Sequence, residues 1–264
     1  MSEEVITEYK TIPIEIPRAF TVATCAASAG DETHIRSVCE NEPNAIVMKD
    51  DIHCDPISWA ARNSRVGVIT YLLAKDADVE SKSFGGMRPL HHACHVYDEM
   101  VIRELLAKKA DPNATDDSGN TPFHYACRRG VLSLCQILVE AKADVTLKNA
   151  AGMTPLHLAC NSGQVRDGCV IINAMINKSS NTHPPTPLLL LQIAIVLYLL
   201  KQEADPNESD KQGNTPLHIA ARSGFKAVAQ ALVAGGAKQS GNRAGKTPSQ
   251  VASDHDVAKA CEAT

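Results

Sequence analysis

The sequence predicts an all-α solenoid, in which short helical units stack side by side instead of surrounding one shared core. A Thr-Pro-Leu-His tetrapeptide recurs, with variants, at intervals of 33 residues along the 264-residue chain, and self-similarity at a fixed period indicates a repeat architecture. Phe, Tyr and Trp make up only 4% of the residues, so the core is expected to consist mainly of small and aliphatic side chains. Such a core suits thin, closely packed helices.

The motif marks seven repeat units. Thr121, Thr154 and Thr215 open its three closest copies, and Arg88 opens the variant Arg-Pro-Leu-His. With weaker copies at both ends, the units start near residues 21, 55, 88, 121, 154, 215 and 247. We therefore expect one repeat domain over residues 19–264. Residues 1–18 precede it as an extended or disordered segment, in which isoleucines alternate with proline and glutamate.

Each unit is expected to contain a turn followed by two helices, as the fourth unit illustrates. Asp116 and Gly119 form the turn. Thr121 and the proline after it begin the first helix, because threonine is a good N-cap and proline lacks the N–H that would have no partner there. Gly130 ends this helix, since glycine tolerates positive φ. The buried stripe of the second helix is expected to contain Cys135, Leu138 and Val139.

The 33-residue period and the Thr-Pro-Leu-His motif resemble those of the ankyrin repeat family, over about residues 19–264. The resemblance implies a curved stack of β-turn, helix, helix units that bury each other's apolar faces. It implies that partner proteins bind along the concave side and that the motif histidines form hydrogen bonds between neighbouring turns. It also places Asn113 and Asn207 where ankyrin proteins can be hydroxylated, although capping of a turn explains these asparagines more simply.

The fifth unit is 28 residues too long, because its interval, from Thr154 to Thr215, is 61 residues instead of 33. Removal of residues 165–192 joins Gln164 to Ile193 and restores a unit of ordinary length. We therefore predict an insertion over residues 165–192, between the two helices of this unit. Its closure costs on the order of 2 kcal/mol in entropy, which a stack of several units can tolerate.

Three alternatives to this insertion stay open. Thr186 and Pro187 resemble another repeat start, but they lie one helical turn too close to Ala204 for an ordinary unit. Residues 170–172 offer a rival second helix. The segment also begins with valine, whose codons start with GT, and ends at Gln192, which can be encoded as CAG after a pyrimidine tract. These are the sequences found at the two boundaries of an intron. A retained intron translated in frame would therefore give the same sequence.

Charge and apolar patterning exclude several classes of protein. Lys and Arg number 26 and Asp and Glu number 30, so the net charge of −4 lacks the basic excess of a nucleic-acid binder. Residues 1–10 lack the basic start and apolar core of a secretory signal. The longest apolar stretch, residues 188–200, is too short for a membrane-spanning helix of about 20 residues. A cytoplasmic location, with the nucleus as an alternative, is therefore expected.

No cofactor, metal site or catalytic centre is predicted. Among nine cysteines there is no Cys-x-x-Cys pair, and Cys94, Cys127 and Cys160 recur at the repeat period, which favours a shared role as small buried thiols. The motif histidines stand one per unit, about 10 Å apart, too far for a shared zinc ion. His92 and His95 form a pair only. Phosphate-binding loops, nucleophile elbows and metalloprotease motifs are not visible.

Partner binding is expected on the turn tips and on the exposed side of the first helices. The candidate partner-binding residues are Arg62, Phe84, Met87, His95, Val96, Asp117, Arg128, Arg129, Met153, Asn161, Lys211 and Arg222. The apolar members, Phe84, Met87, Val96 and Met153, are expected to cluster as anchors in the middle units. The basic members predict a partner with an acidic segment, with a merely solvated face as the alternative.

The leading functional hypothesis is a monomeric protein–protein interaction scaffold, acting as an adaptor, chaperone or inhibitor and not as an enzyme. The alternative is a regulatory or targeting subunit of a larger enzyme or channel complex. A third class, a hydrolase or metalloprotein built on His92, Cys94 and His95, is the least favoured.

Overall fold

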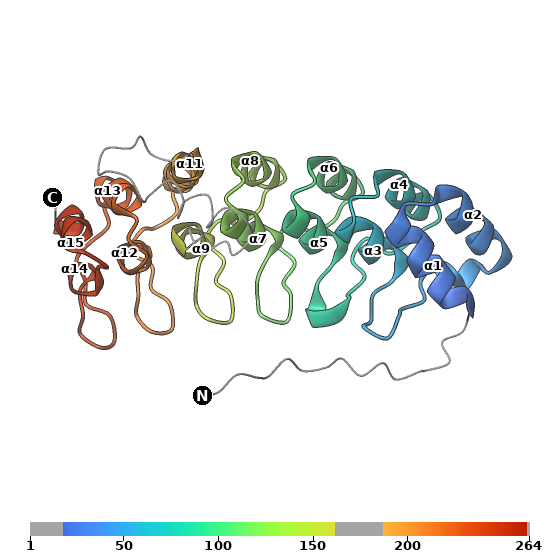
Figure 1. Ribbon diagram of the computed structural model, residues 1–264, viewed down its shortest axis with the longest axis horizontal. Coiled ribbons are helices and arrows are strands. Elements are labelled where there is room, and N and C mark those ends of the chain that lie inside the picture. The colour runs from blue at the N-terminus through green and yellow to red at the C-terminus, as the bar shows by residue number, and fades with distance from the viewer. Residues whose placement is uncertain (1–17, 162–186, 263–264) are drawn as a thin grey trace, which may run out of the picture.

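In the computed structural model, residues 18–161 and 187–262 are described, and they form seven helix pairs standing side by side in two rows (Figure 1). The first helices of the pairs are α1 (Arg18–Ala29), α3 (Pro56–Arg62), α5 (Pro89–Val96), α7 (Pro122–Arg129), α9 (Pro155–Asn161), α12 (Pro216–Arg222) and α14 (Pro248–Val251). The second helices are α2 (Glu32–Asn41), α4 (Val66–Ala74), α6 (Glu99–Ala107), α8 (Leu132–Glu140), α11 (Pro187–Lys201), α13 (Lys226–Ala234) and α15 (His255–Glu262). Two short 3₁₀ helices, η1 (Pro43–Ile46) and η2 (Phe84–Gly86), complete the elements, and the described residues contain no strand. The predicted all-α solenoid is confirmed.

The first helices begin where the motif predicts, because the motif supplies their caps. Thr121 and Thr215 are the N-caps of α7 and α12, and in both a capping box joins the threonine to the histidine three residues later. Asp55 takes the same place before α3 and accepts a hydrogen bond from the Ser58 N–H (2.9 Å). Gly130 ends α7 with φ +78°, the left-handed conformation predicted for it.

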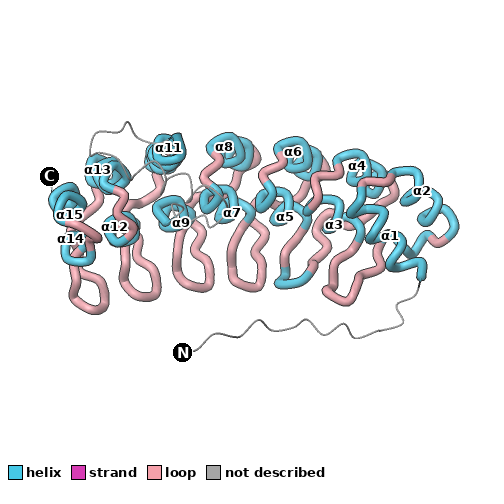
Figure 2. The backbone as a smooth tube through the Cα atoms, viewed as in Figure 1, coloured by secondary structure: helices cyan, strands magenta, loops and turns pink. Residues whose placement is uncertain are grey.

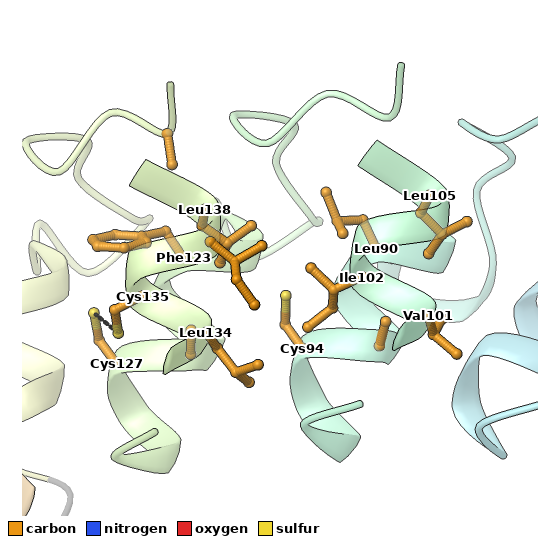
Figure 3. Packing of buried hydrophobic residues seen from close by; sticks show 14 of the residues in the cluster. Leu90, Cys94, Val101, Ile102, Leu105, Phe123, Cys127, Leu134, Cys135 and Leu138 are labelled. Atoms are coloured by element: carbon orange, nitrogen blue, oxygen red, sulfur yellow. Dashed lines mark hydrogen bonds between the residues drawn. The ribbon is translucent and has the colours of Figure 1, made fainter. Parts of the chain in front are cut away.

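The core is a continuous layer between the two rows. Cys94 and Cys127 belong to first helices and are fully buried. Figure 3 shows both among the aliphatic side chains of the core, and their small size lets neighbouring helices approach closely. The predicted stripe of α8 is correct for Cys135 and Leu138, whereas Val139 is only half-buried. Leu134 and Ile137 of the same helix are also buried and complete the stripe.

Loops between the units project to one side of the stack, and we call them fingers (Figure 2). The fingers are residues 50–54, 83–87, 116–120, 149–153, 210–214 and 242–246, each closed by a backbone hydrogen bond between its end residues. From the 83–87 finger onward, neighbouring fingers are joined by backbone hydrogen bonds, for example Asp117 N–H to Gly85 O (2.9 Å) and Ala150 N–H to Ser118 O (2.8 Å). Gly119 has φ +72°, and a Cβ placed there would lie 2.8 Å from the Ala150 nitrogen. Glycine is therefore required by both conformation and space.

The first unit begins earlier than its motif position indicates. Helix α1 starts at Arg18, so Thr21 lies inside the helix and is not its N-cap. The last unit ends in the short helix expected there, α15, whose first turn is held by a hydrogen bond from the Val257 N–H to the Asp254 carboxylate (2.9 Å).

Helix α11 takes the second-helix place in the fifth unit. Ile195, Val196 and Leu199 are fully buried, and the helix packs against α9, α8 and α13. Pro187 therefore begins a second helix and not a new repeat, which excludes that alternative. The predicted insertion boundary at Gln192 falls within α11, because residues 187–192 extend the helix at its N-terminal end. The remainder of the insertion, including the rival residues 170–172, lies outside the described residues.

Candidate protein-binding face

The motif histidines join each first helix to the next finger. In the fourth unit, His124 Nδ1 accepts a hydrogen bond from the Thr121 N–H (3.1 Å), so Nε2 carries the proton and donates it to the Met153 carbonyl (3.1 Å). The other three repeat this arrangement: the Nε2 atoms of His91, His157 and His218 pair with the carbonyls of Asn120, Asn214 and Lys246 at 3.1, 3.1 and 3.0 Å. These histidines are therefore structural links between neighbouring units.

Burial keeps the motif histidines neutral. It lowers the pKa of His91 to about 4, and it also lowers the pKa values of His124, His157 and His218. A protonated ring would place two N–H groups, Nδ1–H and the Thr121 N–H, against each other in the fourth unit. The motif histidines are therefore neutral near neutral pH.

A second set of contacts links the fingers to side chains of the first helices in units two to four. The Trp59 Nε1–H donates to Asp50 (2.6 Å), and the Tyr125 hydroxyl donates to Asp116 (2.7 Å). In the unit between them, Ser83 Oγ pairs with His92 Nε2 (2.7 Å). These side chains fill the corner where finger and helix meet, so the face has a defined shape there.

Arginines lie one helical turn beyond these rings. The Arg62 guanidinium lies over the Trp59 ring, 5.4 Å from its centroid. Arg129 Nη2 reaches the His95 ring at 3.0 Å, and its guanidinium lies 5.5 Å from the centroid of Tyr97. Cation–π contacts of this kind hold the guanidinium groups in place while leaving donors available to a ligand.

All twelve predicted binding residues lie on fingers or at the C-terminal ends of first helices. Exposed members are Arg62, Phe84, Asp117, Arg128, Asn161, Lys211 and Arg222, while Met87, His95, Val96, Arg129 and Met153 are half-buried. Phe84 is the most open of the large apolar residues described, at 70% exposed. We call this surface the finger face.

The apolar candidates are spread along the finger face and do not form one cluster. Phe84 and Met87 share the 83–87 finger, whereas Met153 stands on the 149–153 finger. The 116–120 finger lies between them and is hydrogen bonded to both. Val96 is at the far end of α5. The expectation of a cluster treated turn positions as neighbours, although each finger is a separate step along the stack.

Sequence reasoning missed the aromatic part of the face. Trp59 and Tyr125 occupy the motif position between the histidine, or Ser58 in unit two, and the following alanine, where units five and six have Leu158 and Ile219. At this one motif position the side chain changes from a polar ring in the earlier units to an aliphatic group in the later ones. This change is the sequence signal from which the aromatic part could have been predicted. Tyr97 was missed because it stands where units one, four and six have Gly30, Gly130 and Gly224, in the left-handed conformation with φ 55°.

Asn113 and Asn207 both join neighbouring units. Asn113 Nδ2 donates to the Lys142 carbonyl (3.2 Å), and its Oδ1 accepts from the Asp144 N–H (2.7 Å). Asn207 makes the same pair of bonds with Gly236 (3.0 Å) and Lys238 (2.8 Å). Turn-to-turn bridging accounts for these asparagines.

The cysteines of the described ranges are free thiols, buried except for Cys25. Burial raises the pKa values of Cys94, Cys127 and Cys160, which keeps the thiols protonated. Across residues 18–161 and 187–262, no group of three or more His, Cys, Asp or Glu side chains is placed to hold a metal ion. Nor is any helix in these ranges long and apolar enough to cross a membrane.

The stacked helix pairs and their hydrogen-bonded fingers define a helical repeat protein. A sequence model of the family described as ankyrin repeats (3 copies) matches residues 90–182 and 191–263, more than half of the chain. The chain belongs to the ankyrin repeat family. Ankyrin repeat domains are generally modules for protein–protein interaction.

Individual relatives agree on the fold. The chain is 38% identical over 78 residues to the ankyrin repeat protein YahD of Escherichia coli (strain K12), a match that spans 26% of this chain and 39% of that protein. The crystal structure of the ankyrin repeat domain of Bcl-3, a member of the IkappaB family, has a TM-score of 0.70 at 20% identity, covering 92% of this chain and 98% of that one. The human ASB11 ankyrin repeat domain has a TM-score of 0.71 at 21% identity, covering 91% and 96%.

Proposed function

We propose that this protein is a non-enzymatic interaction scaffold that binds a partner protein along its finger face, with the twelve predicted residues as the contact surface and residues 19–264 as the domain. The observation that carries the proposal is the row of exposed arginines, Arg62, Arg128 and Arg222, which repeats on the first helices of units two, four and six. A protein of net charge −4 with basic side chains aligned on one face suits a partner with an acidic segment.

The corner contacts support the same proposal. Because Trp59 and Tyr125 are hydrogen bonded to the fingers, the surface is set before binding, which reduces the entropy lost on association. An adaptor, a chaperone and an inhibitor would all use such a rigid face. A cytoplasmic or nuclear monomer is part of this proposal.

The test is affinity purification of the full chain from cells that express it, compared with the variant R62E/R128E/R222E. All three side chains are exposed, so we expect an unchanged melting temperature together with loss of the captured partner. The matched control is R103E/K108E/K201E, which makes the same charge change at exposed positions of the second-helix row. The control should retain the partner.

Two further results bear on the proposal. Capture should weaken as salt rises, because exposed charges are screened within about 10 Å at 0.1 M. Equal capture by the two charge variants would overturn the assignment of the face. Recovery of one catalytic protein in stoichiometric amount would favour the alternative, a regulatory or targeting subunit of a larger enzyme or channel complex.

A further inference from the structure

We infer that residues 1–17 of this chain occupy the N-terminal half of the finger face, over units two to four, and so compete with the partner for it. The inference rests on the proposed function in that it concerns the same face, but it has its own readout. Four observations carry it: exposed apolar residues, charge, the place where the chain enters the stack, and reach.

Apolar side chains stand unusually open at the first two fingers. Val47, Ile52 and Phe84 are 58%, 43% and 70% exposed, and they account for half of the large apolar residues this open in the described ranges. Ile52 and Phe84 stand on the 50–54 and 83–87 fingers, and Val47 lies shortly before the first of these, separated from it by Met48 and Lys49. In the segment, Ile12, Ile14 and Ile16 alternate with residues of other types. An extended chain turns such isoleucines to one side.

Charge gives the segment a direction along the face. Residues 1–17 contain four glutamates and one lysine, whereas Arg62, Arg128 and Arg129 line the first helices of units two and four. The exposed carboxylates Asp51 and Asp117 on the fingers would repel these glutamates. The favourable arrangement therefore sets the isoleucines over Ile52 and Phe84, and the glutamates toward the arginines.

The chain enters the stack on the correct side. First helices follow directly from fingers, so each begins at the finger side, and α1 stands beside α3 in the same row (Figure 1). The N-terminal end of α1, at Arg18, therefore lies on the side of the stack from which the neighbouring fingers project. Pro13 and Pro17 favour extended backbone in the residues before them.

The segment is long enough. At about 3.3 Å per residue, Ile14 lies within about 13 Å of Arg18, and Glu8 within about 33 Å. Units are spaced by about 10 Å, so Ile14 reaches the second unit and Glu8 reaches the fourth. A tether of this length gives an effective concentration on the order of millimolar, which favours this occupant over a second copy of the chain.

The experiment places a photo-crosslinking residue in the full chain as Ile14→p-benzoylphenylalanine and maps the links by mass spectrometry. We expect links within one molecule to residues 45–54, next to the second unit, which is the part of the face that position 14 reaches. Mixing isotope-labelled with unlabelled chain identifies links between molecules. The same probe as Lys259→p-benzoylphenylalanine, on the exposed side of α15 at the other end of the stack, should give no link to the 50–54 finger.

The substitution E3K/E4K/E8K changes only the segment, so folding of the stack is not at risk. It should lower the yield of the Ile14-site link by about tenfold, as should 0.5 M salt. Links that join two molecules, links scattered over the stack, or a yield indifferent to the glutamates would overturn the inference. Failure to find an acidic partner would leave these links unchanged, so the two proposals fail separately.

Discussion

The motif histidine is the residue on which the stacking of this chain depends most directly. The fully buried His124 ring accepts a hydrogen bond from the Thr121 N–H within its own unit and donates one to the Met153 carbonyl in the next. Its loss would leave two buried backbone groups without partners and a space where the ring was. The histidine therefore recurs in successive units of this chain because one ring makes both the bond within its unit and the bond to the next unit.

We expect His124→Ala to lower the free energy of unfolding by about 2–4 kcal/mol, since a stranded polar group costs about 1–3 kcal/mol and the cavity adds to this. Urea denaturation measures the change. His255→Ala, at an exposed position on α15, serves as the control and should shift stability by less than about 0.5 kcal/mol. Equal effects of the two substitutions would contradict the bridging role.

At the scale of single elements, glycine allows the fingers both their backbone conformation and their close packing, and the contribution of each to stability can be measured. Gly119 and Gly130 have similar φ angles, +72° and +78°, but a Cβ at Gly119 would strike the neighbouring finger, whereas at Gly130 it would meet nothing within 4 Å. Substitution of these two glycines therefore separates the free-energy cost of a left-handed conformation from the cost of a steric clash within one unit.

Gly130→Ala should cost about 1 kcal/mol, the ordinary penalty for a left-handed residue with a side chain. Gly119→Ala should cost at least about 1 kcal/mol more, because the 116–120 and 149–153 fingers must separate. Urea denaturation of both variants gives the comparison, and amide exchange at Ala150 reports the finger contact itself. Indistinguishable stabilities would show that the fingers adjust freely.

Helix α11 provides the next prediction. The part of it that follows the predicted insertion, Ile193 to Lys201, has the nine-residue length of α4, α6, α8 and α13. Deletion of residues 165–192 should therefore leave a folded array with all seven units and an unchanged or slightly raised melting temperature, since a long closure is removed. Circular dichroism and thermal unfolding test this. A molten or two-phase transition would show that residues 187–192 are needed by the fifth unit.

Sequencing of mature transcripts bears on the origin of the same segment. Messages that lack these 28 codons would support intron retention, and messages that all carry them would exclude it.

For the whole molecule, the buried histidines predict a dependence of stability on pH. The folded pKa values of His91 and His92 are lowered to about 4 and about 3, and those of His124, His157 and His218 are also lowered. The unfolded chain takes up protons near pH 6.5, so it binds more protons than the folded chain below that pH. Stability is fully present above about pH 6.5 and is lost as pH falls toward 4.

The loss due to His91 alone is on the order of 3 kcal/mol across this window, and the five residues together should make the array distinctly acid-sensitive. Urea denaturation at pH 7.0, 5.5 and 4.5 measures the trend. Calorimetric unfolding in buffers of different ionisation enthalpy counts the protons taken up. A stability that is flat between pH 7 and 4.5 would contradict neutral histidines in the folded state.

Much of this architecture could be predicted because the repeat motif encodes local geometry. Threonine, proline and glycine fix where first helices begin and end, and the period then fixes their stacking, so the helix pairs and the exposure of Arg62 and Arg128 followed. The start of α1 could not be predicted, because Thr21 resembles a cap but no turn glycine precedes it in the sequence to set the register. The length of α11 was missed because residues 187–192 continue its apolar run without a break.

The binding face was predictable only in outline. The position of a residue within the repeat was enough to place the candidate side chains on the finger face. Contacts between different units, however, leave no pattern in the neighbouring sequence. Nothing adjacent in sequence indicates that Arg129 meets His95, which lies 34 residues away.

Trp59, the only tryptophan in the chain, lies on this face with its indole N–H bound to Asp50 and a guanidinium above its ring. Its fluorescence therefore reports on the environment of the second unit without any added label. A ligand bound toward the N-terminal end should shift the emission of Trp59. A ligand bound only near Leu158 and Ile219, in units five and six, should leave the emission spectrum unchanged. Intrinsic tryptophan fluorescence therefore distinguishes ligands bound near the second unit from ligands bound further along the stack.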